Sequence, residues 1–102
     1  MTRYSVEFSP EALGQARLVM DWWYENRPKA PELFLDELDA AVEQLTTTPY
    51  AGVGYGRAEI TGMRRLLMPR TRYHVYYTVI TEPPIVRIHA IWHASRRRGP
   101  QL

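Results

Sequence analysis

The side chains with the most chemical potential in this sequence are the arginines and histidines of residues 62–100. His74 and His93 could take up or release a proton near neutral pH. Arg65 and Arg87 belong to the same stretch, and a guanidinium binds phosphates and carboxylates through a planar fork of N–H groups. The stretch also contains three runs of residues typical of β-strands. These features predict a surface that binds an anion or an acidic partner.

Charge is distributed unevenly along the chain. Residues 51–102 carry nine basic residues against Glu59 and Glu82, a net charge of +7. Residues 1–50 carry nine acidic and four basic residues, a net charge of −5. Twelve of the thirteen basic residues are arginine, so the second half is predicted to present an arginine-rich face.

Composition excludes several kinds of site. The chain of 102 residues is predicted to form one domain, residues 1–102. It has no cysteine, which rules out disulfides, zinc–thiolate sites and cysteine nucleophiles. His89 and His93 would lie roughly 13 Å apart on a strand, too far for one metal ion, so we expect no metal and no cofactor. No segment has the apolar length of a membrane span or the pattern of a signal peptide, and we expect a cytoplasmic location without membrane contact.

The first half of the chain is predicted to be a strand followed by two helices. Residues 3–8 alternate apolar and polar side chains, as in a strand with one buried face. Ser9 and Pro10 are typical of a helix start, and this helix should end before Pro28. A second helix is predicted from about Pro31 to Thr46. The two helices should form an antiparallel hairpin.

The second half is predicted to be a loop and an antiparallel three-strand meander. Residues 47–56 contain one proline and three glycines, which indicate a flexible loop. Strands are expected at 65–68, 73–80 and 85–93. The fold class is therefore α+β, with the helices on one face of the sheet.

Pairing Ile80 with Ile85 assigns the side chains of the last two strands to two faces. In this register the helices cover an apolar set: Tyr73, Val75, Tyr77, Val79, Val86, Ile88, Ala90 and Trp92. The open face receives the polar and basic set with one apolar member: Arg65, His74, Tyr76, Thr78, Arg87, His89, Ile91 and His93. A bulge between the two strands would scramble this assignment.

The order of these elements resembles the RelE/ParE superfamily of toxins from bacterial toxin–antitoxin modules. The motifs that carry the resemblance are Leu45-x-x-x-Pro49, Arg64-Arg65-Leu66, Tyr73-x-Val75-x-Tyr77, and Ile91-x-His93 followed by arginines. The resemblance covers nearly the whole chain and implies a small toxin that a cognate antitoxin neutralises. RelE-like members cut mRNA on the ribosome, whereas ParE-like members poison DNA gyrase.

The resemblance is nearer to the ParE-like branch. Ribonuclease members have an arginine after the tyrosine that starts the second meander strand, and here that position is His74. A tyrosine after the last strand is also missing, since Ala94 follows His93 and residues 95–102 contain none. A ribonuclease needs a base for the 2′-hydroxyl, a cation for the developing charge and an acid for the leaving oxygen. The ribonuclease alternative would have to use Arg65, His74, Arg87 and His93.

For the ParE-like branch, the resemblance implies contact surfaces in place of catalytic residues, so we expect the chain not to act as an enzyme. The expected partners are the antitoxin and DNA gyrase, with the ribosome and its mRNA as the alternative target. The tail of arginines continues the basic face, and Trp22 is expected to be exposed for the antitoxin. The predicted partner-binding residues are Trp22, Arg64, Arg65, Arg87, His93, Arg96, Arg97 and Arg98.

Overall fold

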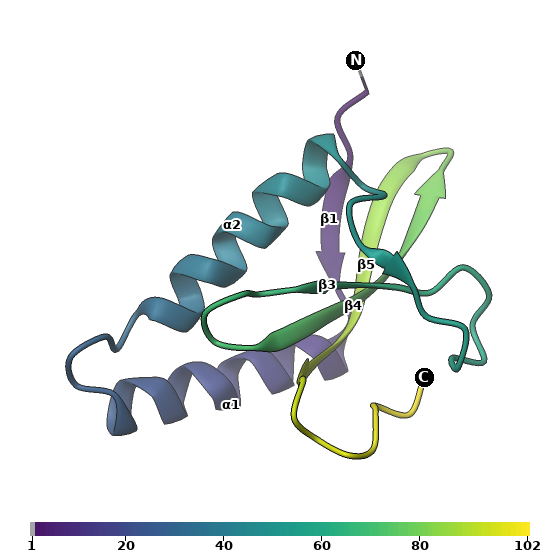
Figure 1. Cartoon of the computed structure of the whole chain (residues 1–102). Helices are drawn as coiled ribbons and strands as arrows, with labels where there is room; N and C mark the ends of the chain where they lie inside the picture. The colour runs from purple at the N-terminus through teal and green to yellow at the C-terminus, as the bar shows by residue number, and fades with distance from the viewer. Residues whose placement is uncertain (1) are drawn as a thin grey trace.

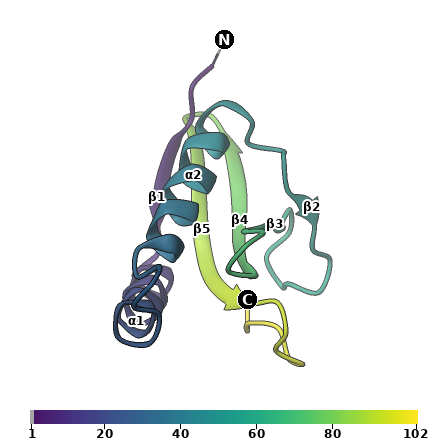
Figure 2. The same cartoon turned by 60° about the vertical axis from the view of Figure 1, so that its left-hand side comes forward.

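Within residues 2–102, five strands form one mixed sheet, and two helices cover one of its faces (Figures 1 and 2). The structure is a computed structural model that describes residues 2–102. The spatial order of the strands is β1-β5-β4-β3-β2, in which β1 is parallel to β5 and the other pairs are antiparallel. The elements are β1 Ser5–Phe8, α1 Pro10–Asn26, α2 Leu33–Thr47, β2 Val53–Gly54, β3 Arg64–Leu67, β4 Tyr73–Thr81 and β5 Pro84–His93. The predicted α+β class, helix hairpin and meander are confirmed.

Helix α1 begins where the sequence predicts. The Ser9 hydroxyl accepts a hydrogen bond from the Ala12 N–H at 3.1 Å, which satisfies one of the free donors of the first turn. Pro10 occupies the first helical position, where it needs no N–H partner. Ala12 and Ala16 are buried against the sheet, and their small side chains allow α1 to lie close to β5.

Helix α2 contributes larger buried side chains to the apolar cover of the sheet than α1 does. Its buried side chains follow one another at helical spacing: Phe34, Leu38, Ala41 and Leu45. They pack with the inward side chains of β4 and β5, including Val75, Tyr77, Val86 and Ile88. In the part of the chain that the structure describes, neither helix is long and apolar enough to cross a membrane.

A β-bulge at His89 divides the pairing of β4 and β5 into two registers. From Ile80 opposite Ile85 to Tyr77 opposite Ile88, the observed pairs match the predicted ones. The register then shifts by one residue, so that Tyr76 lies opposite Ala90. Such a bulge adds one residue to one strand and exchanges the faces of the residues beyond it.

Polar side chains of the first helical segment hold this bulge in place. The Ser9 hydroxyl donates to the His89 carbonyl at 3.3 Å. The Ile91 N–H, for which β1 offers no partner, donates to the Gln15 side chain at 2.8 Å. Because β1 ends at Phe8 and α1 continues beside β5, these contacts replace missing strand hydrogen bonds.

The bulge makes part of the predicted face assignment wrong. Ile91, predicted on the open face, is buried in the core beneath the helices. His93, also predicted on the open face, lies opposite Tyr73 at the end of β5, and its ring packs against the ring of Tyr73 on the helix side of the strand pair. Trp92 and Ala90, predicted beneath the helices, pack with Tyr76 and Met63 in a second cluster on the other side of the sheet. Tyr73, Val75, Tyr77, Val86 and Ile88 do face the helices as predicted.

The segment between α2 and β3, predicted to be a flexible loop, makes specific contacts with the rest of the sheet. Val53–Gly54 forms the short strand β2 on the edge of the sheet. The Gly52 N–H donates to the Tyr77 hydroxyl at 2.9 Å, and the Gly52 carbonyl accepts from the Arg64 guanidinium. Gly52 is therefore required for a close approach between backbones, which loop flexibility alone does not explain.

Replacement of Gly52 by alanine should destabilise the fold. A Cβ at this position would lie 2.6 Å from the Arg65 carbonyl oxygen and 2.7 Å from the Tyr77 hydroxyl. We expect Gly52→Ala to lower the free energy of unfolding by roughly 1–3 kcal/mol, as other overpacked sites do. Gly54→Ala is the matched control, because a Cβ there meets no atom within 4 Å. Equal urea midpoints for the two variants would contradict this account.

Candidate functional site

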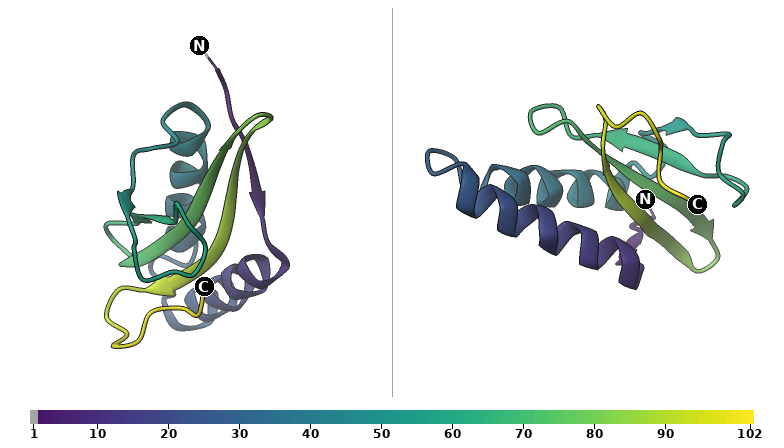
Figure 3. Two further views of the ribbon diagram at one scale, coloured as in Figure 1. Left: turned by 90° about the vertical axis from the view of Figure 1, so that its right-hand side faces the viewer. Right: turned by 90° about the horizontal axis from the view of Figure 1, so that it is seen from below.

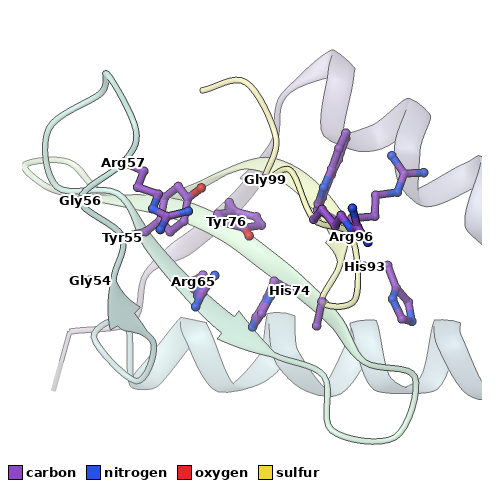
Figure 4. Close-up of a pocket in the computed structure, with 13 residues that line it drawn as sticks. Gly54, Tyr55, Gly56, Arg57, Arg65, His74, Tyr76, His93, Arg96 and Gly99 are labelled. Carbon is purple, nitrogen blue, oxygen red and sulfur yellow. The ribbon is translucent and has the colours of Figure 1, made fainter.

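A pocket of about 320 Å³ lies on the face of the sheet opposite the helices. We call it the open-face pocket. Figure 4 shows Tyr55 and Arg57 on one side, His93 and Arg96 on the other, and the side chains of β3 and β4 between them. Its principal lining side chains are basic or aromatic: Tyr55, Arg57, Arg65, His74, Tyr76, Trp92, His93, Arg96 and Arg97. No carboxylate lines it, so the pocket favours an anion.

Aromatic rings position two of the arginines. The Arg65 guanidinium lies 5.4 Å from the centre of the Tyr55 ring, and the Arg96 guanidinium lies 4.3 Å from the Trp92 ring. Cation–π contacts hold a guanidinium without neutralising its charge. Tyr55 in turn packs edge-on against Tyr76, with 5.0 Å between ring centres.

The segment that follows β5, residues 94–102, folds back across this face (Figure 3). The Trp92 indole N–H donates to the Arg98 carbonyl at 2.7 Å. The Glu59 N–H donates to a carbonyl oxygen of Leu102 at 2.7 Å, and the Leu102 side chain packs on the second cluster. These contacts close the pocket on one side and place Arg96 and Arg97 at its wall.

His74 lies on the floor of the open-face pocket between cations. Burial lowers its pKa, and the positive charges of Arg65 and Arg72 lower it further. The imidazole is therefore neutral at pH 7, and a neutral imidazole offers one nitrogen as a proton acceptor. His74 can act as a base or as a hydrogen-bond partner for a bound ligand.

His93 is less free to act as a base. Its Nδ1 atom accepts the Ser95 N–H at 3.1 Å and lies 2.7 Å from the Ser95 hydroxyl. Because the backbone N–H always donates, these contacts favour the tautomer with the proton on Nε2. His93 then presents an N–H donor to its surroundings, and its ring packs edge-on against Tyr73 at 4.8 Å.

A carboxylate on α2 fixes the turn between β3 and β4. Glu37 accepts hydrogen bonds from the Arg70 N–H at 2.9 Å, the Thr71 N–H at 2.8 Å and the Thr71 hydroxyl at 2.7 Å. Arg72 follows with a positive φ of 67°, a conformation that is uncommon outside glycine. The turn leads directly into Tyr73 and so determines where β4 begins.

The structure brings together some of the predicted site residues and separates others. Of the ribonuclease set, Arg65, His74 and His93 line the same pocket. Arg87 does not line it and forms an ion pair with Glu7 at 3.8 Å, opposite Thr78.

Three other predicted partner-binding residues, Arg64, Arg98 and Trp22, lie outside the open-face pocket. Arg64 donates to the carbonyls of Tyr50 and Gly52, so its guanidinium holds the loop before β2. Arg98 lines a neighbouring cavity beside the Trp92 ring, outside the open-face pocket. Trp22 is 45% exposed, as predicted.

Sequence reasoning missed Tyr55, Arg57 and Trp92 as parts of the site. Tyr55 and Arg57 belong to a glycine-rich segment whose path the sequence does not reveal. Trp92 was assigned to the wrong face because the bulge depends on Ser9 and Gln15, which are distant in sequence. The signal in the sequence is the alternation of β5 itself, because a one-residue slip in that strand places Trp92 on the open face.

Within residues 2–102 the structure contains no group of three or more histidine and acidic side chains placed to hold a metal ion. The chemistry of the open-face pocket is instead that of guanidinium, imidazole and phenol groups. These groups bind anions through hydrogen bonds and charge.

Comparisons with known proteins agree on one family. The model for the "ParE toxin of type II toxin-antitoxin system, parDE" matches residues 6–98. The structure is similar to the chromosomal ParDE system from P. aeruginosa, with a TM-score of 0.68 and 19% identity over 91% of this chain and 98% of that chain. It is similar to the E. coli RelBE toxin–antitoxin complex, with a TM-score of 0.66 and 19% identity over 91% and 99%. No curated protein sequence matches the chain.

A third similar structure is the toxin–antitoxin complex RelBE2 from Mycobacterium tuberculosis. It has a TM-score of 0.65 and 22% identity over 93% of this chain and 97% of that chain. At these identities the structural likeness shows the fold, and the family model shows the family.

Removal of the Glu37 carboxylate should loosen the turn that precedes β4. Thr71 is almost fully buried, and Glu37 is the acceptor for both its N–H and its hydroxyl. We expect Glu37→Gln to lower the free energy of unfolding at pH 7 by roughly 1–2 kcal/mol, because charged hydrogen bonds are lost. Glu43→Gln is the control on the same helix, since its ion pair with Arg3 is exposed and contributes little.

The effect of Glu37 should depend on pH in a defined direction. Burial would raise the pKa of this carboxyl, but its hydrogen bonds from Arg70 and Thr71 lower the pKa below the ordinary value of 4.5. A lowered pKa in the folded chain means that the stabilisation is present above that value and is lost as the pH falls through the folded pKa. Urea unfolding at pH 7 and pH 3 should show the difference from Glu37→Gln shrinking at pH 3. A constant difference would contradict the assignment.

Proposed function

Because the chain belongs to the ParE toxin family of type II toxin–antitoxin systems, we propose that it inhibits growth by binding DNA gyrase and trapping the enzyme with its DNA cleaved. The observation that carries this proposal is the match of the ParE toxin model over residues 6–98. A cognate antitoxin would hold the toxin inactive until it is needed. The target and the action are both cytoplasmic in this proposal.

The open-face pocket supplies a contact surface suited to such a target. Four arginines reach it from three segments: Arg57, Arg65, Arg96 and Arg97. In residues 2–102 the ion pairs are Arg3 with Glu43 and Arg87 with Glu7, so these four guanidinium groups keep their charge for a partner. Charged groups at a protein interface govern association rate and orientation as well as affinity.

A ribonuclease acting on ribosome-bound mRNA is the second candidate. It is favoured by one observation: Arg65 and a neutral His74 line the same pocket. His74 could accept the 2′-hydroxyl proton while Arg65 stabilises the charge on the phosphate oxygens. The geometry weakens this candidate elsewhere, because Ser95 occupies Nδ1 of His93 and Arg87 lies outside the pocket.

Two assays run side by side distinguish the candidates. The purified chain is added to a DNA supercoiling reaction with gyrase and, separately, to an in vitro translation reaction. We expect the supercoiling reaction to stop, with accumulation of cleaved DNA, while translation continues. Inhibition of translation with cleavage of the mRNA, and an unaffected supercoiling reaction, would overturn the gyrase proposal in favour of the ribonuclease.

Substitutions in the open-face pocket should separate surface contact from proton transfer. We expect His74→Gln and His93→Gln to leave toxicity largely intact, whereas Arg96→Gln with Arg97→Gln should weaken it several-fold through slower association. A ribonuclease would behave in the opposite way, because loss of its general base costs about 10²- to 10⁴-fold in rate. Growth after induction measures the effect, with Arg17→Gln on α1 as the charge control and immunoblotting to confirm expression.

Point substitutions of Arg96 and Arg97 test the effect of charge on toxicity more specifically than truncation after His93 does. Truncation would also remove the Arg98 carbonyl that accepts the Trp92 indole N–H and the Leu102 side chain that packs on the second cluster. Its effect on toxicity would therefore combine lost charge with lost folding. Substitutions at positions 96 and 97 keep these contacts.

The antitoxin should be encoded beside the toxin and should change the toxin's behaviour in solution. A basic surface and exposed aromatic side chains such as Trp22 and Tyr24 favour association with an acidic amphipathic segment that orders on binding. We expect co-expression of the neighbouring gene to restore growth and to yield a complex that co-purifies. Full solubility and normal growth with the toxin chain alone would count against the proposal.

A further inference from the structure

Large apolar side chains on the outer surface of α1 have no cover within residues 2–102. Leu18 is 73% exposed, Tyr24 is 70% exposed and Leu13 is 40% exposed. Exposed apolar side chains that gather on one element mark an interaction surface. The view from below in Figure 3 shows α1 lying along the outside of the molecule. This surface of α1 is therefore accessible to a partner.

Gly14 lies on the same surface and has no role in the packing of the chain itself. A Cβ added there would meet no atom within 4 Å, and its backbone is helical. Glycine inside a helix is destabilising relative to alanine, because it loses more conformational freedom on folding. Its missing side chain leaves a notch in the outer surface of α1, into which a side chain of another molecule fits.

Arg17 and Asp21 are exposed on this surface and carry opposite charges. Neither takes part in the ion pairs that the structure contains in residues 2–102. Arg17 precedes Asp21 by about one helical turn, which is the less favourable order for an ion pair within one helix. In a second helix that runs antiparallel the order is reversed, so that each charge meets its opposite.

We propose that two copies of this chain associate through α1 in an antiparallel, two-fold arrangement centred at the level of Val19. Positions 14, 17, 21 and 24 follow one another at spacings of three and four residues, so they form one stripe along the helix. In this arrangement Arg17 of each copy lies opposite Asp21 of the other. Gly14 of each copy lies opposite Tyr24 of the other, whose ring fills the notch.

Apolar contacts add to this pairing on both edges of the stripe. Leu13 lies next to Gly14 and packs against the Tyr24 ring of the second copy. Leu18 is one residue from the two-fold axis, so the two Leu18 side chains meet. Burial of these side chains supplies the affinity, whereas the charges fix the orientation of the two helices and their register.

The charges of the stripe favour a second copy over a partner of one charge. An acidic helix or a phosphate backbone would place a negative group opposite Asp21, and a basic helix would place a cation opposite Arg17. Both positions are satisfied only by a helix that carries the two signs in the reversed order. Helix α1 itself, turned end to end, is such a helix.

The length of α1 sets the strength of the expected dimer. Its 17 residues span roughly 25 Å. Pairing along this length buries on the order of 1,000 Å² in total, which is at the lower end of specific interfaces. We expect a dissociation constant on the order of 10 µM, so that the chain is a monomer when dilute and a dimer at about 100 µM.

The dimer leaves both open-face pockets accessible. Each pocket lies on the sheet face opposite the helices and is lined by residues of one chain. A basic cavity of about 620 Å³ beside α1, which Arg70 and Arg96 help to line, adjoins the interface at Leu18. Growth inhibition therefore does not require the dimer, and the dimer does not rest on the proposed function.

Sedimentation equilibrium of charge variants tests the pairing. Arg17→Glu and Asp21→Arg each place like charges opposite one another, and each should weaken the dimer by about tenfold or more. The double variant, Arg17→Glu with Asp21→Arg, should restore the original dissociation constant to within about threefold. The two single variants, when mixed in equal amounts, should form a heterodimer, because each supplies the charge that the other lacks. Urea unfolding confirms that every variant is folded.

Gly14→Ala separates association from folding. A Cβ at this position meets no atom of the same chain, so the urea midpoint should stay equal or rise. The dimer should weaken several-fold, because the notch that receives Tyr24 is filled. Glu43→Gln on α2 is the matched control, because its carboxylate pairs with Arg3 outside the interface, and it should dimerise as the original chain does.

Four outcomes would overturn the proposal. In the first, the original chain remains a monomer at about 100 µM. In the second, it dimerises but neither single charge variant weakens the dimer. In the third, the double variant and the mixture of single variants remain monomeric. In the fourth, Gly14→Ala dimerises as tightly as the original chain. Because sedimentation needs no gyrase, failure here is distinguishable from failure of the proposed target.

Discussion

The β-bulge at His89 is the constraint on which the rest of the site depends. Without the extra residue in β5, Trp92 would lie in the core and Ile91 would face solvent. With it, Ile91 joins the core under the helices, and Trp92 provides the ring on which Arg96 stacks. The bulge is stabilised by Ser9 and Gln15, so the start of α1 determines the composition of a pocket on the opposite face of the sheet. Fold and site are linked through these few polar contacts.

Aromatic rings, in place of carboxylates, hold two of the four arginines of this site. A salt bridge would also fix a guanidinium, but it would cancel the charge that a partner must meet. Stacking on Tyr55 and Trp92 restricts Arg65 and Arg96 while leaving their N–H groups free. Burial, together with the same concentration of positive charge, lowers the pKa of His74 and keeps it neutral. The electrostatics of the pocket thus favour the binding of an anion. Proton transfer in the pocket would depend on one residue, His74.

Much of the fold is predictable from local sequence patterns. The Ser9–Pro10 start of α1 and the apolar stripe of α2 rest on contacts within a few residues, and the structure confirms them. Pairing near the turn between β4 and β5 also follows from alternation. The bulge, the path of the glycine-rich segment and the return of residues 94–102 across the sheet depend on contacts between distant residues. For that reason Arg65 and His74 were placed correctly, whereas Trp92 was not.

The acidic half of the chain affects the site because its carboxylates do not pair with the arginines that line the site. Its carboxylates lie mainly on the helix hairpin, and Glu37 is used to hold a turn through backbone N–H groups. Of the arginines of the second half, four line the open-face pocket, and Arg70 lines the edge of α1 together with Arg96. This separation of acidic from basic residues lowers the stability of the fold only slightly, because exposed ion pairs would add little stability. It leaves two adjacent basic cavities that share Arg96 in their lining.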